Sequence, residues 1–157
     1  MKLNRLTDYA VLILWRLSQP AKSGELTDNK GNRIMSAPSL SEETIVPLPT
    51  VSKIVKMLAK QGLVNSVRGS NGGSSLAKDS ASITVAQIIE AIEGPLSLTA
   101  CVEEGGEVCE HTKLCGMSGN WDKVNDQVLA VLNSIPLDDM VPKPLSFLDP
   151  ETFTPKE

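Results

Sequence analysis

The sequence predicts a mainly α-helical fold with one small β-hairpin and a long separate helix near the C-terminal end. Three observations lead to this fold class. Apolar residues recur at helical spacing in three segments before residue 95, two short strand-like runs within 63–77 flank a glycine-rich turn, and a one-sided apolar stripe follows residue 119. The length of 157 residues accommodates a small domain with an appended arm.

Residues 3–17 predict the first helix. Its inward stripe consists of Leu3, Leu6, Ala10, Ile13 and Leu17. At about 100° per residue, Asp8 lies on the opposite side, which also carries Val11, Leu12 and Trp15. A helix that is apolar on two sides usually contacts two bodies. Asp8 is therefore either a solvated acid that stabilises the first turn or a functional carboxylate beside that second surface.

Two further helices follow a polar segment. Residues 21–38 are rich in Gly, Asn, Asp, Lys and Ser, which predicts a loop or a small hairpin. A capping box at 39–42 predicts a short helix that ends at 46–48. The next helix begins at Pro49, buries an apolar stripe and ends at Gly62.

The outward face of the helix that begins at Pro49 carries Lys53, Lys56 and Lys60 and no acidic residue. Two short helices joined by a tight turn, the second of them basic, predict a helix-turn-helix motif whose second helix enters a major groove. The alternative is a solvated row of lysines.

The segment after Gly62 predicts a wing. Residues 63–67 have the pattern of a strand, 68–73 that of a turn, and 74–77 that of a returning strand. Arg68 and the glycines of the turn suit contact with phosphates or with a minor groove. A plain surface hairpin is the alternative.

The remaining segments complete the predicted organisation. A capped helix spans 84–93, and apolar residues at helical spacing from Trp121 to Ile135 favour a two-fold dimer, with packing on its own domain as the alternative. The predicted parts are a winged helix-turn-helix DNA-binding domain at 1–94, a cysteine loop at 95–118, a dimerisation helix at 119–139, and an extended acidic, proline-rich tail at 140–157.

The three cysteines, Cys101, Cys109 and Cys115, fall within fifteen residues of a polar, glycine-containing segment. Three thiols cannot all pair with one another, and the segment lacks the apolar residues of a core. No apolar run approaches the roughly 18 residues of a membrane span, and the N-terminal residues do not form a signal-peptide core. We therefore expect a cytoplasmic protein whose clustered thiols bind metal or take part in redox chemistry.

Charge is distributed as unevenly as the cysteines. Residues 1–94 carry eleven Lys and Arg against eight Asp and Glu, whereas residues 95–157 carry four against eleven. The first part suits an anionic partner and the second would be repelled by one. We do not expect an enzyme, because no phosphate-binding glycine loop occurs and His111 is the one histidine.

These motifs resemble the Rrf-two family of bacterial winged-helix iron–sulfur transcriptional regulators. The resemblance rests on Leu3, Tyr9 and Ala10, on the motif from Gly62 to Gly73, on 76–78 and 88–93, and on the three-cysteine loop. The motif at 93–96 is most similar to members linked to iron–sulfur cluster assembly under stress, the SUF regulators. The family implies a homodimer that binds double-stranded operator DNA and holds a 2Fe–2S or 4Fe–4S cluster, and we expect it to act as a repressor.

The resemblance also implies the residues of both sites. DNA contacts would come from Thr50, Ser52, Lys53 and Lys56 of the recognition helix and from Arg68, Ser70 and Asn71 of the wing. The cluster ligands would be Cys101, Cys109 and Cys115, with Asp8 matching a first-helix aspartate that reaches the cluster from the other protomer. The histidine that some members place three residues after the third cysteine is Ser118 here, and His111 is the alternative ligand.

The chain departs from the family pattern in three places. Ser74 and Ser75 stand where an aromatic residue is usual, which could weaken wing packing; the segment 23–38 is long; and the first cysteine spacing is seven residues where five is common. Two rival functions also stay open. The three thiols could bind zinc in a metal- or thiol-based regulator of the same fold, or could serve an electron-transfer or cluster-delivery protein.

Overall fold

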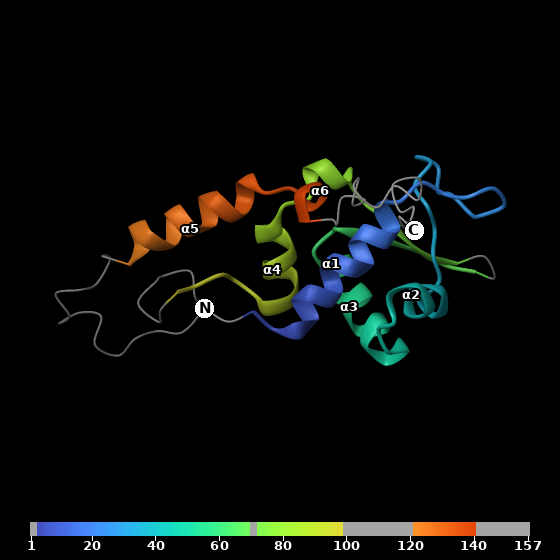
Figure 1. Ribbon diagram of the computed structural model, residues 1–157, viewed down its shortest axis with the longest axis horizontal. Coiled ribbons are helices and arrows are strands. Elements are labelled where there is room, and N and C mark those ends of the chain that lie inside the picture. Colours follow the sequence, from blue (N-terminus) through green and yellow to red (C-terminus); the bar gives the residue numbers. More distant parts are fainter. Residues whose placement is uncertain (1–2, 70–71, 99–120, 141–157) are drawn as a thin grey trace, which may run out of the picture.

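The computed structural model describes residues 3–69, 72–98 and 121–140. The first part contains α1 (Arg5–Ser18), α2 (Ala37–Thr44), α3 (Leu48–Lys60), β1 (Val64–Val67) and β2 (Gly73–Leu76). A 3-10 turn, η1 (Ser80–Ser82), leads to α4 (Val85–Glu93), and α5 (Asp122–Ser134) and α6 (Leu137–Met140) follow. The mainly α-helical fold with a small β wing is confirmed. Figure 1 shows α1 to α4 gathered in the centre, with the strands and α5 extending from opposite ends.

The core lies where α1 packs against α2, α3 and α4. The inner side of α1 consists of Ala10, Ile13, Leu14 and Leu17, all of which are fully or almost fully buried. The predicted stripe was wrong at Leu3, which is exposed, because Asn4 caps the helix and Leu3 precedes it. The second apolar surface is smaller than expected, since Val11 packs against the core and the Arg16 guanidinium lies 4.5 Å from the centre of the Trp15 ring.

The start of α2 lies three residues before the predicted start. Ser36, not Ser39, is the N-cap, and its hydroxyl accepts a hydrogen bond from the Ser39 backbone N–H. The helix α3 was predicted correctly to within one residue at both ends. Its Val51, Ile54, Val55 and Leu58 side chains are buried, as the apolar spacing indicated. The capping box of α4, formed by Thr84 and Gln87, is present.

The two strands of the wing are antiparallel, with Val64 opposite Leu76 and Val67 opposite Gly73. The segment before α2 forms a hairpin in which Thr27 pairs with Arg33, and Met35 then pairs with Ser74 of β2. We call residues 25–35 the arm. The two Met35–Ser74 backbone hydrogen bonds, of 2.9 and 2.8 Å, attach the arm to the outer edge of the wing.

The helix α5 ends at Ser134, five residues before the predicted end, because Pro136 follows and cannot continue the backbone hydrogen bonding. After α5 the chain returns to the domain: Val85 N–H donates to the Ile135 carbonyl and Leu137 N–H donates to the Ile83 carbonyl. Leu137 is fully buried in the core. None of the helices in the described part of the chain has the length and apolar run that a bilayer crossing requires.

Candidate nucleic-acid interface and the neck of the cysteine segment

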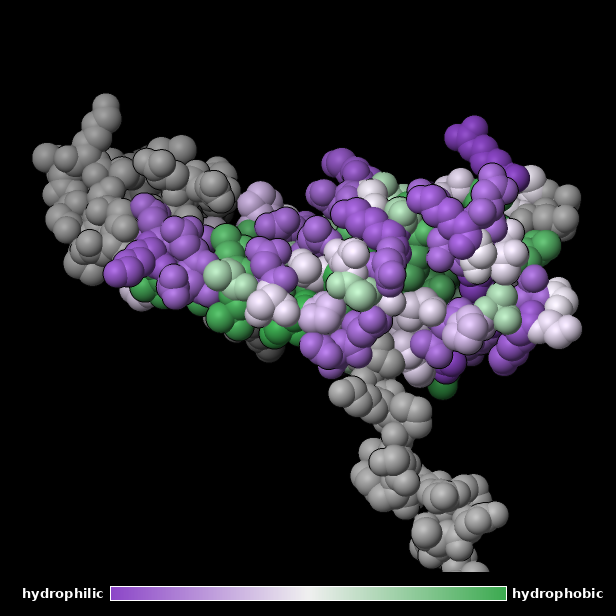
Figure 2. All heavy atoms as spheres, turned by 90° about the horizontal axis from the view of Figure 1, so that it is seen from above, coloured by the Kyte–Doolittle hydropathy of each residue, from purple (hydrophilic) through white to green (hydrophobic). Residues whose placement is uncertain are grey.

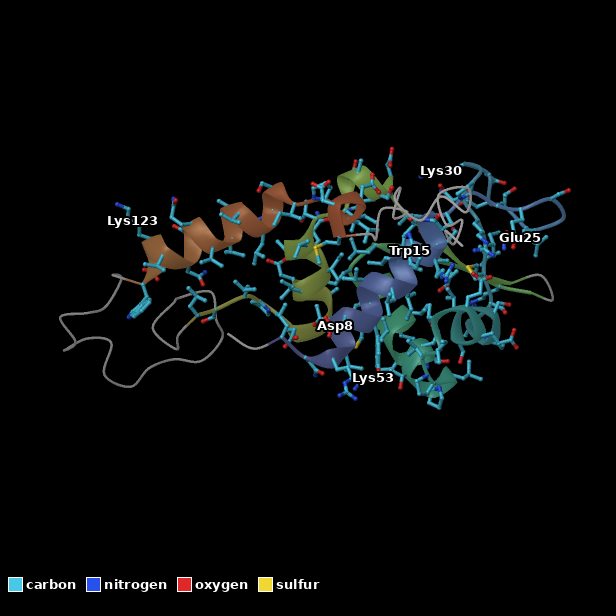
Figure 3. All side chains as sticks on the ribbon, in the orientation of Figure 1. Asp8, Trp15, Glu25, Lys30, Lys53 and Lys123 are labelled. Carbon is cyan, nitrogen blue, oxygen red and sulfur yellow. The ribbon has the colours of Figure 1, made fainter. Side chains whose placement is uncertain are left out.

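The outward side of α3 presents Lys53, Lys56 and Lys60, which are all exposed; we call these three residues the lysine face. No acidic residue occurs on this helix, and none of the three lysines takes part in a recorded salt bridge among the described residues. Four buried apolar side chains on the opposite side hold the helix rigidly on the core. The lysine face is therefore a fixed row of positive charge. Figure 3 shows Lys53 projecting from the same side of the molecule as the beginning of α3.

Two of the predicted groove-facing residues are less accessible. Thr50 and Ser52 are partly buried, whereas Lys53 and Lys56 are exposed. Because Pro47 occupies the N-cap, no side chain caps α3, and the positive end of its dipole faces outward. The arrangement suits an anionic partner lying along the helix.

The wing places Arg68 on its exposed side, while Ser70 and Asn71 lie outside the described residues. The glycines of the turn serve the wing itself. A Cβ on Gly72 would lie 2.5 Å from the Val67 carbonyl oxygen, and one on Gly73 would lie 2.5 Å from that of Met35. The close backbone approach that the sequence suggested toward phosphate is thus, at these two positions, an approach to the chain's own backbone.

The serines that replace the usual aromatic residue are paired. Ser75 is completely buried, and its hydroxyl donates to Asp28 Oδ2 of the arm over 2.9 Å. Asp28 also accepts from the backbone N–H groups of Lys30 and Asn32 and from the Asn32 side-chain amide. Two of the departures from the family pattern are therefore linked, because the long segment covers the strand on which the small serines stand. Ser74 and Ser75 are both buried in this arrangement.

A buried ionic cluster holds the arm to α2. Arg33 is only 5% exposed and donates to both Glu25 oxygens, at 2.7 and 2.6 Å, and to both Glu43 oxygens, at 3.3 and 2.8 Å. The hydrogen bonds from Arg33 lower the pKa of Glu25 below its ordinary value. Burial raises the pKa of Asp28, but the hydrogen bonds from Asn32, Ser75 and Lys30 together lower it below its ordinary value.

Asp8 is exposed on the first turn of α1. The beginning of this helix is fixed by Glu93 at the end of α4: Glu93 Oε1 accepts from Asn4 N–H over 2.6 Å and from the Thr7 hydroxyl over 2.7 Å. Figure 3 shows Asp8 near α4 and far from the arm that carries Glu25 and Lys30. Asp8 thus lies near the N-terminal end of α1, which contacts the C-terminal end of α4. The cysteine segment follows α4 in the sequence.

The cysteine segment itself lies outside the described residues, and with it Cys101, Cys109, Cys115, His111 and Ser118. Its two ends are described, and we call residues 96–98 and 121–125 the neck. Asn125 of α5, 1% exposed, donates to the Leu96 carbonyl over 3.2 Å and accepts from Leu98 N–H over 3.1 Å. Among the residues that the structure describes, no three His, Cys, Asp or Glu side chains gather as a metal site.

Comparison with known proteins identifies the family. A family model described as "Rrf2: Iron-dependent Transcriptional regulator" matches residues 3–143. The chain belongs to the Rrf2 (Rrf-two) family. The HTH-type transcriptional regulator IscR of Escherichia coli O1:K1 is 34% identical over 102 residues, which are 65% of this chain and 62% of that protein. The match therefore spans less than two thirds of this relative's length.

Solved structures agree with the Rrf2 assignment. CymR, the global cysteine regulator of B. subtilis, has a TM-score of 0.60 and 27% identity, with coverage of 89% of this Rrf2 chain and 95% of that one. IscR of T. potens has a TM-score of 0.56 and 30% identity, with coverage of 89% and 85%. The winged-helix fold is shared with both.

Sequence reasoning missed three features of this Rrf2 chain. The polar side chain of Asn125 gave no sign of burial, and the pairing of Met35 with Ser74 joins residues far apart in the sequence. Ile45 and Leu48, in the turn between α2 and α3, were treated only as the boundary of a helix, yet both are exposed apolar residues. The apolar residues that directly precede and begin this basic helix could have indicated the exposed surface at Ile45 and Leu48.

Proposed function

We propose that this Rrf2-family chain is a dimeric transcriptional regulator, a repressor, that binds operator DNA and senses iron–sulfur cluster or redox status. The lysine face carries the DNA-binding part of the proposal. It is a row of unpaired positive charges on a helix that the core holds in place, and the wing stands beside it on the next segment of the chain. We do not assign an enzymatic activity.

In this proposal α3 lies in the major groove. Lys53 and Lys56, which are exposed, bind phosphates, and the partly buried Thr50 and Ser52 reach base edges. Arg68, Ser70 and Asn71 contact the backbone or the minor groove from the wing. Phosphate contacts position the protein, and the hydroxyl contacts contribute to specificity.

The donor set suits an iron–sulfur cluster. Cys101, Cys109 and Cys115 supply three thiolates, and Asp8 supplies a weaker oxygen ligand from the partner protomer. When bound, a cluster provides a group whose oxidation or loss changes the charge and conformation of the segment that holds it. Asp8 is exposed, as a residue that reaches another protomer must be.

This chain's own residues connect the thiolate segment to the DNA-binding helix. Asn125 holds the neck, Glu93 holds the first turn of α1, and α1 packs directly against α3. A change in the position of the cysteine segment therefore acts on a helix that contacts the recognition helix. We infer that DNA affinity follows the state of the segment along this path.

The decisive experiment is the visible spectrum of anaerobically purified protein together with its iron, sulfide and zinc content. Iron with matching sulfide supports the cluster, and their ratio to protein gives its type. Zinc without sulfide would replace the cluster sensor by a zinc-dependent regulator, and metal-free protein would leave a thiol-based one. Cysteine-to-serine variants at the three positions should each lose the metal.

The fourth ligand is tested separately. Asp8→Ala should shorten the lifetime of the cluster in air while the protein stays dimeric by light scattering. Asp126→Ala, which removes an exposed carboxylate from α5, is the matched control and should leave the lifetime unchanged. A cluster that is unaffected by Asp8→Ala but lost in His111→Ala would transfer the role to His111.

A further inference from the structure

The turn between α2 and α3 carries an apolar surface that the lysine face does not account for. Ile45 is 91% exposed and Leu48 is 43% exposed, and Pro47 and Pro49 beside them are also exposed. Val46, between them, is buried and fixes the turn to the core. Single exposed apolar side chains are common on proteins, but a contiguous group of them usually marks a contact surface.

Ile45 also holds a backbone conformation that its own side chain disfavours. Its φ of 58° and ψ of 22° lie in the left-handed region. Within residues 3–69, 72–98 and 121–140 it is the one non-glycine residue with positive φ. A β-branched residue is strained there, whereas glycine or asparagine is not. Because the Ile45 side chain is almost fully exposed, it recovers little of that strain from packing inside the protomer, which points to a contact outside it.

The position of this surface selects its partner. Leu48 is the first residue of α3 and Ile45 lies three residues before it, and the same helix carries the lysine face. The first residues of a recognition helix are those that reach base edges. The apolar group that B-form DNA offers in the major groove is the 5-methyl group of thymine.

We propose that Ile45 and Leu48 determine sequence specificity by packing against thymine methyl groups at one edge of each half-site. The inference rests on the proposed function in one respect, namely that α3 is the recognition helix. It adds two apolar specificity residues to the polar DNA contacts predicted from the sequence. It also explains why a strained isoleucine occupies position 45. Lys53 and Lys56 then supply affinity, and the turn supplies discrimination.

Uracil replacement tests the contact directly, because uracil differs from thymine only by the missing methyl group. Duplexes are first selected from a random-sequence library by binding to the anaerobically purified full chain. Each thymine of the selected site is then replaced singly by uracil. At one or two positions the wild-type affinity should fall about three- to five-fold, as expected for the loss of one buried methyl group.

Two variants assign the effect to the turn. Ile45→Gly and Leu48→Ala should each bind the thymine and uracil forms of one such position with equal affinity. Ile45→Gly should have a Tm equal to or above that of the wild type, because glycine adopts the left-handed conformation without strain. Lys53→Ala is the matched control, and it should weaken both forms equally while the thymine preference stays.

The outcomes separate the two proposals. If the selection yields no duplex that binds with salt-dependent affinity, DNA binding itself fails, and the proposed function with it. If the protein binds duplexes but does not distinguish thymine from uracil, or both variants keep the distinction, DNA binding stands and the role of Ile45 and Leu48 is overturned. The exposed turn would then belong to a protein partner.

Discussion

Asp28 organises the arm through a single carboxylate. Its two oxygens accept from backbone N–H groups of the turn, from the Asn32 amide and from the buried Ser75 hydroxyl. An amide cannot accept all of these bonds, since one of its two polar atoms is a donor. Replacement of this one side chain therefore affects both the turn of the arm and its attachment to β2.

We expect Asp28→Asn to lower the free energy of unfolding by about 1–2 kcal/mol at neutral pH. The pKa of Asp28 is lowered in the folded state, so its contribution is fully present above its ordinary pKa of 3.8 and is lost as the pH falls through the folded value. The difference between wild type and variant in urea denaturation should thus shrink as the pH is lowered below 3.8. A difference that is constant over this range would show that the charge of Asp28 is not responsible.

Asn125 closes the neck by bonding two backbone groups of one segment, and it is almost completely buried. Asn125→Ala leaves the Leu96 carbonyl and the Leu98 N–H without these partners, so we expect a loss of about 2 kcal/mol in the free energy of unfolding. Gln127→Ala, at an exposed position of the same helix, is the control and should cost well under about 1 kcal/mol. Equal losses in chemical denaturation would mean that the neck contributes no special stability.

At the scale of elements, the proposal that α3 is the recognition helix predicts that its lysine face contributes to DNA affinity through charge. Each lysine that neutralises one phosphate contributes about 0.9 to the slope of log affinity against log salt. The double variant Lys53→Ala, Lys56→Ala should therefore reduce that slope by about 1.8, measured by fluorescence anisotropy over a salt series. Lys123→Ala, on α5 and apart from α3 in Figure 3, should leave the slope unchanged. An equal reduction by both changes would remove α3 from the interface.

The elements predicted correctly from the sequence are those that local chemistry determines. Thr84 and Gln87 define the start of α4 because capping involves residues three apart, and alternation around the glycine-rich turn gave both strands to within one residue. The start of α2 was misplaced because Ser36 and Ser39 are both good N-caps. The preceding chain decides between them, since Met35 is held to β2 and brings Ser36 into place.

Contacts between residues far apart in the sequence could not be predicted from local patterns. Nothing in the segment 25–35 indicates that Arg33 is buried between Glu25 and Glu43, since isolated charges usually stay in water. The candidate sites divide in the same way. Periodicity indicated the lysine face, whereas the burial of Asn125 and the strain at Ile45 depend on the folded backbone. The ligand set of the cysteines was obtained from the family resemblance and remains a prediction.

At the scale of the whole molecule, α5 has two apolar sides. Val128, Leu129, Leu132 and Ile135 pack toward Val85, Ile89 and Leu96 of the same chain. Trp121, Val124 and Val131 remain exposed, the last at 60%. Figure 2 shows apolar side chains gathered along the part of the molecule formed by α5, between hydrophilic neighbours. One side of the helix is thus buried against the same protomer, and the exposed apolar side is suited to packing against a second copy of the chain.

We expect Val131→Glu to prevent the proposed dimer from forming without unfolding the protomer, because a charge buried between two symmetry-related helices is doubly unfavourable. Sedimentation velocity gives the mass, and circular dichroism checks the helix content. Ala130→Glu places the same charge on the neighbouring exposed position and should remain dimeric. Dimers of unchanged stability in both variants would assign the interface to another surface.

The neck has a consequence for how such chains can diverge. Leu98 and Asn125 are joined by a hydrogen bond, so the two ends of the segment between them are held together. The free-energy cost of holding the ends of a longer segment together grows slowly, by about 0.6 kcal/mol for each doubling of the segment's length. Insertions of one or two residues between the cysteines therefore need no adjustment in the helices of the winged-helix domain. The spacing of the cysteines can therefore change, and with it the metal chemistry that we propose for this segment, while the winged-helix domain stays unaltered.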